Sequence, residues 1–124
     1  MNKPSILVVD DELLIRDLLY DFFTSQGWDI AVAESGDKAL EMTRARKFDL
    51  VLTDVKMPEM DGLALTGHIR QSFPNMPIVL MTGFPSVDSA VAALRNKVDD
   101  YVIKPFNINQ LYKVLEARIK ERRA

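Results

Sequence analysis

The stretch that decides the fold reads Ile6-Leu7-Val8-Val9-Asp10-Asp11, a short apolar run that ends in two acids. Four consecutive apolar residues, three of them β-branched, are typical of a strand that is buried on both faces, as strands of parallel sheets are. The run is far shorter than the ~20 residues that a membrane span needs. The stretch therefore predicts a buried strand that delivers two carboxylates at its end.

Four further apolar runs follow, and amphipathic segments separate them. The predicted strands are residues 6–9, 30–33, 48–53, 77–82 and 101–103. Between residues 14 and 23, Leu, Ile and Phe recur at the i, i+3, i+4 spacing of a helix, which Gly27 ends. Ser35 and Ser86 are expected to cap two later helices, and another is predicted over residues 63–72.

Strands that alternate with helices predict an α/β fold with one domain over residues 1–124. We expect a flavodoxin-like, doubly wound (βα)5 arrangement, with a parallel five-stranded sheet in the order 2-1-3-4-5 and helices on both faces. Right-handed crossovers then place the C-terminal ends of all strands at one edge of the sheet. In this order the first and third strands are neighbours, so the residues that follow them should meet.

Composition excludes several classes of function. The chain has 124 residues, a net charge of −2, no cysteine and one histidine, His68. A disulfide scaffold, a thiol nucleophile, a zinc finger and a multi-histidine metal site are therefore excluded. No basic stripe, apolar span or signal peptide is evident. We therefore expect a cytoplasmic protein without direct nucleic-acid or membrane partners.

Four of the five predicted strands bring a polar residue to the shared edge: Asp10-Asp11 after the first, Asp54 after the third, Thr82 after the fourth and Lys104 after the fifth. Three carboxylates about 4 Å apart would repel by ~4 kcal/mol per pair at an effective dielectric of about 20. Such a cluster takes up protons or binds a cation. Oxygen donors alone favour a hard cation such as Mg²⁺, and the lysine and threonine suit phosphoryl oxygens.

Four segments in order resemble the receiver domain of response regulators in two-component signalling, over essentially the whole chain. They are Val8-Val9-Asp10-Asp11-Glu12, Asp54-Val55-Lys56-Met57-Pro58-Glu59-Met60-Asp61-Gly62, Met81-Thr82-Gly83, and Asp100-Tyr101-Val102-Ile103-Lys104-Pro105-Phe106. Each segment alone is a modest signal, whereas all four at these spacings form a strong one. The resemblance implies a phosphorylation switch related to chemotaxis regulators.

The resemblance also implies the metal ligands and the acceptor. Asp54 would be the phospho-acceptor. Asp11 and Asp54 would ligate Mg²⁺ directly, together with the backbone carbonyl of Lys56, and Asp10 would act through water on the ion.

Further roles implied by the resemblance concern the phosphoryl group and the switch. Lys104 would pair with one phosphoryl oxygen and Thr82 would donate a hydrogen bond to another. Tyr101 would change rotamer when Thr82 moves toward the phosphate. The bond between Lys104 and Pro105 is expected to be cis.

The implied partners are a sensor histidine kinase or a phosphotransfer protein, and an output domain or protein target. The output surface would comprise the fourth helix, the fifth strand and the fifth helix, with a homodimer on phosphorylation as a further possibility. On this reading the domain is not an enzyme for other substrates, but it catalyses its own phosphorylation and dephosphorylation.

The sequence departs from the family pattern after the fourth helix, where Lys97-Val98 stand in place of the usual Gly-Ala. Either Asn96 takes the left-handed turn that ends this helix, or Lys97 does so at a cost of ~1 kcal/mol. The positions two beyond the acceptor and two beyond Thr82 hold Lys56 and Phe84. In the family these positions tune how water reaches the acyl phosphate, and bulky Phe84 should slow its hydrolysis.

Three other functions compete with the signalling interpretation. A small phosphatase with an aspartyl nucleophile would need Asp-x-Asp after the first strand, where this chain has adjacent aspartates. A receiver-like interaction module that works without phosphorylation typically loses an acid or the lysine, and this chain keeps them all. A flavin carrier would need a hydroxyl-rich loop where Asp10-Asp11-Glu12 would repel phosphate.

Overall fold

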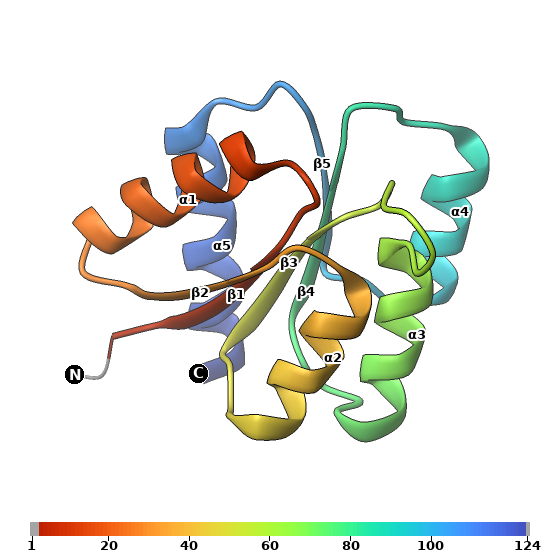
Figure 1. The fold of residues 1–124 in the computed structure, drawn as a ribbon, viewed down its shortest axis with the longest axis horizontal. Coiled ribbons are helices and arrows are strands. Elements are labelled where there is room, and N and C mark those ends of the chain that lie inside the picture. The colour runs from red at the N-terminus through yellow and green to blue at the C-terminus, as the bar shows by residue number, and fades with distance from the viewer. Residues whose placement is uncertain (1–2, 124) are drawn as a thin grey trace.

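The structure is a computed structural model that describes residues 3–123, so residues 1, 2 and 124 of the predicted domain lie outside the described part. Strands and helices alternate along the whole of it (Figure 1). The elements are β1 (Ser5–Val9), α1 (Leu13–Ser25), β2 (Asp29–Ala33), α2 (Gly36–Ala45), β3 (Leu50–Asp54), α3 (Gly62–Ser72), β4 (Ile78–Thr82), α4 (Val87–Arg95), β5 (Asp100–Ile103) and α5 (Ile108–Arg123). The predicted strands agree within two residues at either end.

The five strands form one parallel sheet in the order β2-β1-β3-β4-β5, which confirms the predicted topology. Strand order reverses between β1 and β3, because β1 pairs with β2 on one side and with β3 on the other. Ligand sites of doubly wound sheets lie at such a switch point, beyond the carboxyl ends of the strands. The residues that follow β1 and β3 are therefore candidates for a ligand site.

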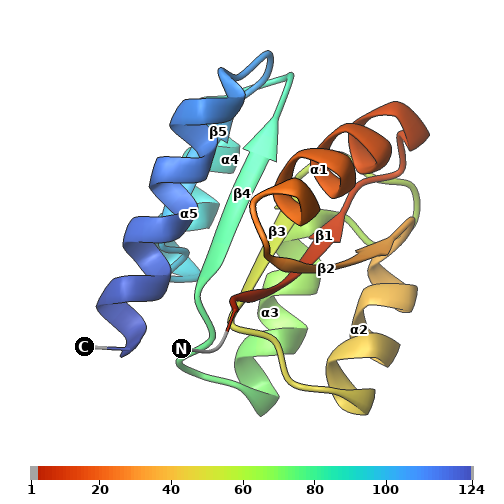
Figure 2. The same ribbon diagram turned by 90° about the vertical axis from the view of Figure 1, so that its left-hand side faces the viewer.

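Helices cover both faces of the sheet (Figure 1 and Figure 2). Because side chains alternate along a strand, Ile6 and Val8 face one side while Leu7 and Val9 face the other. The first side packs against α1 and α5, and the second against α2, α3 and α4. All four side chains are fully buried, which explains the unbroken apolar run in the sequence.

Local sequence signals set several helix ends. The side chain of Ser35 accepts a hydrogen bond from the backbone N–H of Lys38 at the start of α2. Ser86 does the same for Ser89 at the start of α4, so both predicted caps are confirmed. Gly27 has φ of 85°, the left-handed conformation that follows the end of α1.

The apolar pattern of α1 predicts the helix correctly but overstates how much of it is buried. Leu19 and Phe23 are fully buried against the sheet, whereas Leu14 is 82% exposed and Leu18 is 50% exposed. The apolar residues of α1 therefore extend beyond the arc of the helix that contacts the sheet.

The left-handed residue after α4 is Lys97, with φ of 56°, rather than Asn96, whose φ is −86°. The guanidinium of Arg70 on α3 stabilises this turn. It donates to the carbonyl oxygens of Asn96 at 3.3 Å and Lys97 at 2.9 Å, and also to that of Met76. These bonds satisfy backbone acceptors that a helix end leaves free, so a non-glycine residue is tolerated here.

The bond between Lys104 and Pro105 is cis, as expected. His68 lies on the exposed side of α3. No helix within residues 3–123 combines the length and the apolar character that crossing a membrane requires.

Gly62 should tolerate no side chain, because a Cβ atom there would lie 2.1 Å from the backbone carbonyl oxygen of Asp54. We expect Gly62→Ala to lower the free energy of unfolding by about 2–3 kcal/mol, the cost of an overpacked core. Gly67→Ala is the matched control on the same helix, since the nearest atom to its Cβ would be 3.9 Å away. In urea unfolding the control should be neutral or stabilised by up to about 1 kcal/mol. Equal effects at the two positions would contradict the prediction.

Candidate functional site

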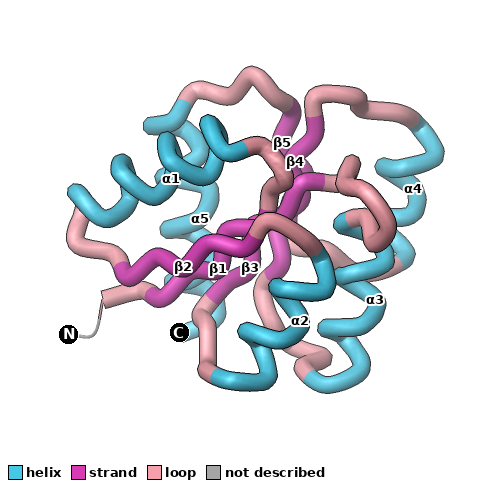
Figure 3. The backbone as a smooth tube through the Cα atoms, in the orientation of Figure 1, coloured by secondary structure: helices cyan, strands magenta, loops and turns pink. Residues whose placement is uncertain are grey.

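The loops that follow β1, β3, β4 and β5 gather at one end of the sheet (Figure 3). Asp10 directly follows β1, Asp54 ends β3, Thr82 ends β4 and Lys104 directly follows β5. Asp54 lies beside Met81 in the register of β3 and β4, so Thr82 is one residue beyond its partner. The strand ends thus bring together the polar residues that the sequence spreads over nearly a hundred positions.

The ammonium group of Lys104 links the acids at this edge. Its Nζ atom donates to Asp10 Oδ2 at 2.7 Å and to Asp54 Oδ2 at 3.1 Å, and Glu12 Oε1 lies 3.4 Å away. Asp10 is 0% exposed and Asp54 is 4% exposed, so both carboxylates are shielded from bulk water. Ion pairs in such surroundings are screened much less than pairs at the surface.

Backbone donors fix the second oxygen of each buried carboxylate. Asp10 Oδ1 accepts from the N–H of Glu12 at 2.9 Å, and Asp54 Oδ1 accepts from the N–H of Lys56 at 3.3 Å. Each carboxylate is therefore oriented by its own loop on one side and by Lys104 on the other.

One ammonium group does not balance two buried carboxylates. Burial raises the pKa of Asp10 despite its bonds to Lys104 and Glu12. Burial also raises the pKa of Asp54, and the neighbouring charge of Asp10 raises it further, against the opposing effect of Lys104. Burial by itself would lower the pKa of Lys104, but its bonds to both aspartates outweigh this and raise it. The site therefore carries excess negative charge that a further cation would relieve.

The donors present fit a hard cation. Asp10, Glu12 and Asp54 each offer a carboxylate oxygen, and the three atoms lie within 4.8 Å of one another. A cavity of about 300 Å³ opens beside them and is lined by Asp11, Glu12, Asp54, Lys56, Gly83, Phe84 and Lys104. All donors are oxygen atoms, which suits Mg²⁺.

The structure distinguishes the two adjacent aspartates that follow β1. Asp10 is buried and bonded to Lys104, whereas Asp11 is exposed and lines the cavity beside Asp54 and Lys56. Sequence reasoning gave Glu12 no role, yet its side chain reaches Lys104. Its position directly after the two aspartates, at the same strand end, was the available signal.

Thr82 is the last residue of β4, and Tyr101 lies on the neighbouring edge strand β5. Thr82 is fully buried, and its hydroxyl accepts from the N–H of Phe84 at 3.0 Å. The hydroxyl of Tyr101 lies 2.7 Å from that of Ser89 on α4. Sequence reasoning missed Ser89, because nothing in the linear pattern indicates a partner for the tyrosine hydroxyl.

The protein is a doubly wound α/β domain whose acids and lysine meet beyond the carboxyl ends of the strands, where ligands of this class of fold bind. The chain belongs to the response regulator receiver domain family, whose family model matches residues 6–116.

Curated relatives agree with this family. The chain is 44% identical over 115 residues to the transcriptional regulatory protein ZraR of Escherichia coli O157:H7, which covers 93% of the chain and 26% of that protein. It is 39% identical over 106 residues to the response regulator protein FleR of Pseudomonas aeruginosa, covering 86% of the chain and 22% of that protein. The chain thus spans about a quarter of the length of these relatives.

Solved structures show the same fold. A CheY-like receiver domain protein from Methanospirillum hungatei JF-1 superposes with a TM-score of 0.95 at 27% identity, covering 98% of both chains. The response regulator TrrA from Thermotoga maritima, solved in complex with Mg²⁺ and BeF, has a TM-score of 0.85 at 35% identity, covering 93% of this chain and 98% of that one.

Replacing Asp54 by asparagine should stabilise the fold at neutral pH. Because the pKa of Asp54 is raised, its ionised form destabilises the folded state above that pKa, and the penalty disappears as pH falls and the carboxyl takes up a proton. We expect Asp54→Asn to increase the free energy of unfolding at pH 7 by about 1 kcal/mol. The gain should shrink toward acidic pH in urea titrations.

Asp17→Asn, at an exposed position on α1, is the matched control and should change little. A loss of stability in Asp54→Asn at pH 7 would contradict the assigned direction.

Proposed function

We propose that Asp54 accepts a phosphoryl group from the phosphohistidine of a sensor histidine kinase or of a phosphotransfer protein. The observation that carries the proposal is the ammonium group of Lys104, which is 3.1 Å from Asp54 and 2.7 Å from Asp10 at the switch point of the sheet. A fixed cation beside the acceptor stabilises the charge that a phosphoryl group brings. Membership of the receiver family supports the same role.

The transfer step follows from the groups at the strand ends. A carboxylate oxygen of Asp54 attacks phosphorus in line, the bond from phosphorus to the donor imidazole nitrogen breaks, and the imidazole leaves. The product is an acyl phosphate on Asp54. Lys104 pairs with one phosphoryl oxygen and the hydroxyl of Thr82 donates to another, so the chain contributes positioning and neutralisation of charge.

Asp11, Asp54 and the backbone carbonyl of Lys56 would hold Mg²⁺, with Asp10 acting through water. Bound Mg²⁺ supplies neutralisation of the charge on the phosphoryl oxygens. The carboxylate oxygens beside the cavity and the excess acidic charge support this cofactor. The TrrA relative solved with Mg²⁺ and BeF supports it as well.

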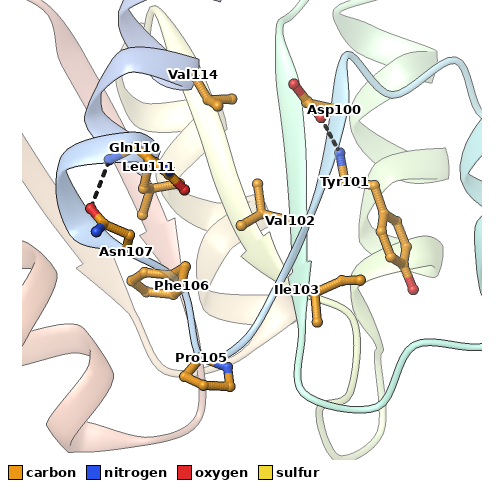
Figure 4. A pocket seen from close by; sticks show the side chains of 10 residues that line it. All are labelled: Asp100, Tyr101, Val102, Ile103, Pro105, Phe106, Asn107, Gln110, Leu111 and Val114. Carbon is orange, nitrogen blue, oxygen red and sulfur yellow. Dashed lines mark hydrogen bonds between the residues drawn. The ribbon is translucent and has the colours of Figure 1, made fainter.

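The output surface in this proposal comprises α4, β5 and α5. Two hollows flank β5: one of about 370 Å³ lies against α4, and one of about 320 Å³ lies against α5 (Figure 4). Large apolar side chains are exposed on the same side, with Val87 80%, Leu94 77% and Ile103 53% exposed. Apolar surface of this kind is typical of docking sites, here for an output domain, a protein target or a second phosphorylated copy.

In this proposal the domain is a switch and not an enzyme for other substrates. It promotes its own phosphorylation and the later hydrolysis of the acyl phosphate. The curated relatives ZraR and FleR are named as regulators, which favours a signalling role over a phosphatase or a flavin carrier.

Incubation with acetyl phosphate and Mg²⁺ tests the acceptor. We expect intact mass spectrometry to show an adduct of about 80 Da, the mass of an added phosphoryl group. The adduct should be absent in Asp54→Asn and should form normally in Asp17→Asn, an exposed control. Removal of Mg²⁺ with a chelator should reduce the rate of its formation at least tenfold.

Other outcomes would favour the competing functions. Steady release of inorganic phosphate without an adduct would indicate a phosphatase. A protein that binds its target equally well with and without acetyl phosphate would indicate an interaction module that works without phosphorylation.

Phe84 should slow the loss of the phosphoryl group. Its side chain is 73% exposed and lines the same cavity as Asp54. In this position its bulk would hinder water from approaching the acyl phosphate in line. We expect Phe84→Ala to shorten the lifetime of the acyl phosphate about threefold or more, followed by mass spectrometry after acetyl phosphate is removed. Val87→Ala is the control, because Val87 is 80% exposed and does not line the cavity. An unchanged or longer lifetime in Phe84→Ala would contradict this role.

A further inference from the structure

A hydrogen bond joins α4 to the edge strand of the sheet. The hydroxyl oxygens of Ser89 on α4 and Tyr101 on β5 are 2.7 Å apart, a distance typical of a well-formed hydrogen bond between hydroxyl groups. The half-buried ring of Tyr101 packs against the core cluster that includes Ala93 of α4. Figure 4 shows this ring on the other side of β5 from Val102 and Leu111. The ring of Tyr101 therefore lies on the α4 side of β5 rather than on the α5 side.

The same serine hydroxyl also forms part of the helix cap. Ser89 Oγ donates to the carbonyl oxygen of Ser86 at 3.1 Å and accepts from the N–H of Ser86 at 3.3 Å, while Ser86 Oγ accepts from the N–H of Ser89 at 3.0 Å. Glu or Gln usually occupies the third position of such a capping box. Here the third position is Ser89, and its Oγ has two hydroxyl neighbours: Ser86 Oγ donates to it at 3.1 Å and the hydroxyl of Tyr101 lies 2.7 Å away.

A hydroxyl group has one proton, which restricts how this cluster can be bonded. When Ser89 donates to the carbonyl of Ser86, the hydroxyl of Tyr101 must be the donor to Ser89. A movement of the Tyr101 ring away from α4 would then break its bond to a residue of the capping box. The tyrosine conformation and the first turn of α4 are therefore coupled.

The loop before α4 begins at Thr82, the residue proposed to bind a phosphoryl oxygen. Thr82 Oγ1 accepts from the N–H of Phe84 at 3.0 Å, and residues 83–86 connect this bond to the cap of α4. α4 is loosely attached to the rest of the fold, since Ala93 is the one residue that it buries within the described part of the chain. A displacement of Thr82 can therefore shift the start of α4, where Ser89 lies, because the connecting loop is short and α4 is weakly packed.

We propose that Ser89 is a positioning residue that holds Tyr101 against α4 in the unphosphorylated protein. Phosphorylation, which draws Thr82 toward the acceptor, must break this bond for Tyr101 to leave α4. The inference rests on the proposed function of Asp54 and adds a restraint that sets how readily the switch responds. Loss of the bond favours the phosphorylated arrangement.

A double-mutant cycle in the unphosphorylated protein tests the contact. Urea unfolding is measured for the wild type, Ser89→Ala, Tyr101→Phe and the double variant. We expect the product of the two single-substitution effects on the equilibrium constant of unfolding to exceed the effect in the double variant by about fivefold, the scale of one hydrogen bond. Ser89→Ala combined with Tyr112→Phe, a tyrosine of α5, is the matched control and should be additive. Additivity in the Tyr101 cycle would overturn the inference.

Phosphorylation by acetyl phosphate and Mg²⁺ tests the regulatory role. Ser89→Ala should raise the initial rate of adduct formation about threefold, and Ser89→Thr, which keeps the hydroxyl group, should restore the rate of the wild type. An unchanged or lower rate in Ser89→Ala would overturn the proposal. If the wild type forms no adduct on Asp54, the proposed function fails and the regulatory role fails with it. The unfolding cycle tests the contact between Ser89 and Tyr101 independently of phosphorylation.

Discussion

The candidate site is governed by the burial of two carboxylates beside one ammonium group at the carboxyl edge of a parallel sheet. Asp10 and Asp54 come from neighbouring strands, and Lys104 reaches both from the far edge strand. Removing charged groups from water is costly, and it is tolerated only where each group has partners of opposite charge or hydrogen-bond donors. Lys104 and two backbone N–H groups provide those partners, but they do not neutralise the site.

This imbalance links stability to function. The pKa values of Asp10 and Asp54 are raised mainly by burial, so their ionised forms destabilise the folded protein. A further cation beside them would reduce this cost. A protein selected for stability alone would replace such a pair. The acidic charge supports the proposed binding of Mg²⁺ and a phosphoryl group, and a cavity of about 300 Å³ lies beside Asp54.

The side of the molecule that would transmit the signal is built differently from the core. β1, β3 and β4 are buried on both faces, whereas β5 is an edge strand and α4 buries one residue in the described structure. Segments with few buried apolar contacts open more easily than the core. A few polar contacts therefore hold the position of α4: the bonds from Arg70 at its C-terminal end and the hydroxyl cluster of Ser86, Ser89 and Tyr101 at its N-terminal end.

The sequence by itself determined the alternation of strands and helices and the residues at each strand end, because apolar runs constrain these strongly. The strand order was expected from the known doubly wound fold class, and the tertiary structure confirms it. Only the tertiary structure decided that Asp10 rather than Asp11 bonds Lys104, that Glu12 joins them and that Lys97 takes the left-handed turn. It also decided that Leu14 is exposed and that Ser89 meets Tyr101. These features depend on side-chain directions and on contacts between distant segments, which linear periodicity does not encode.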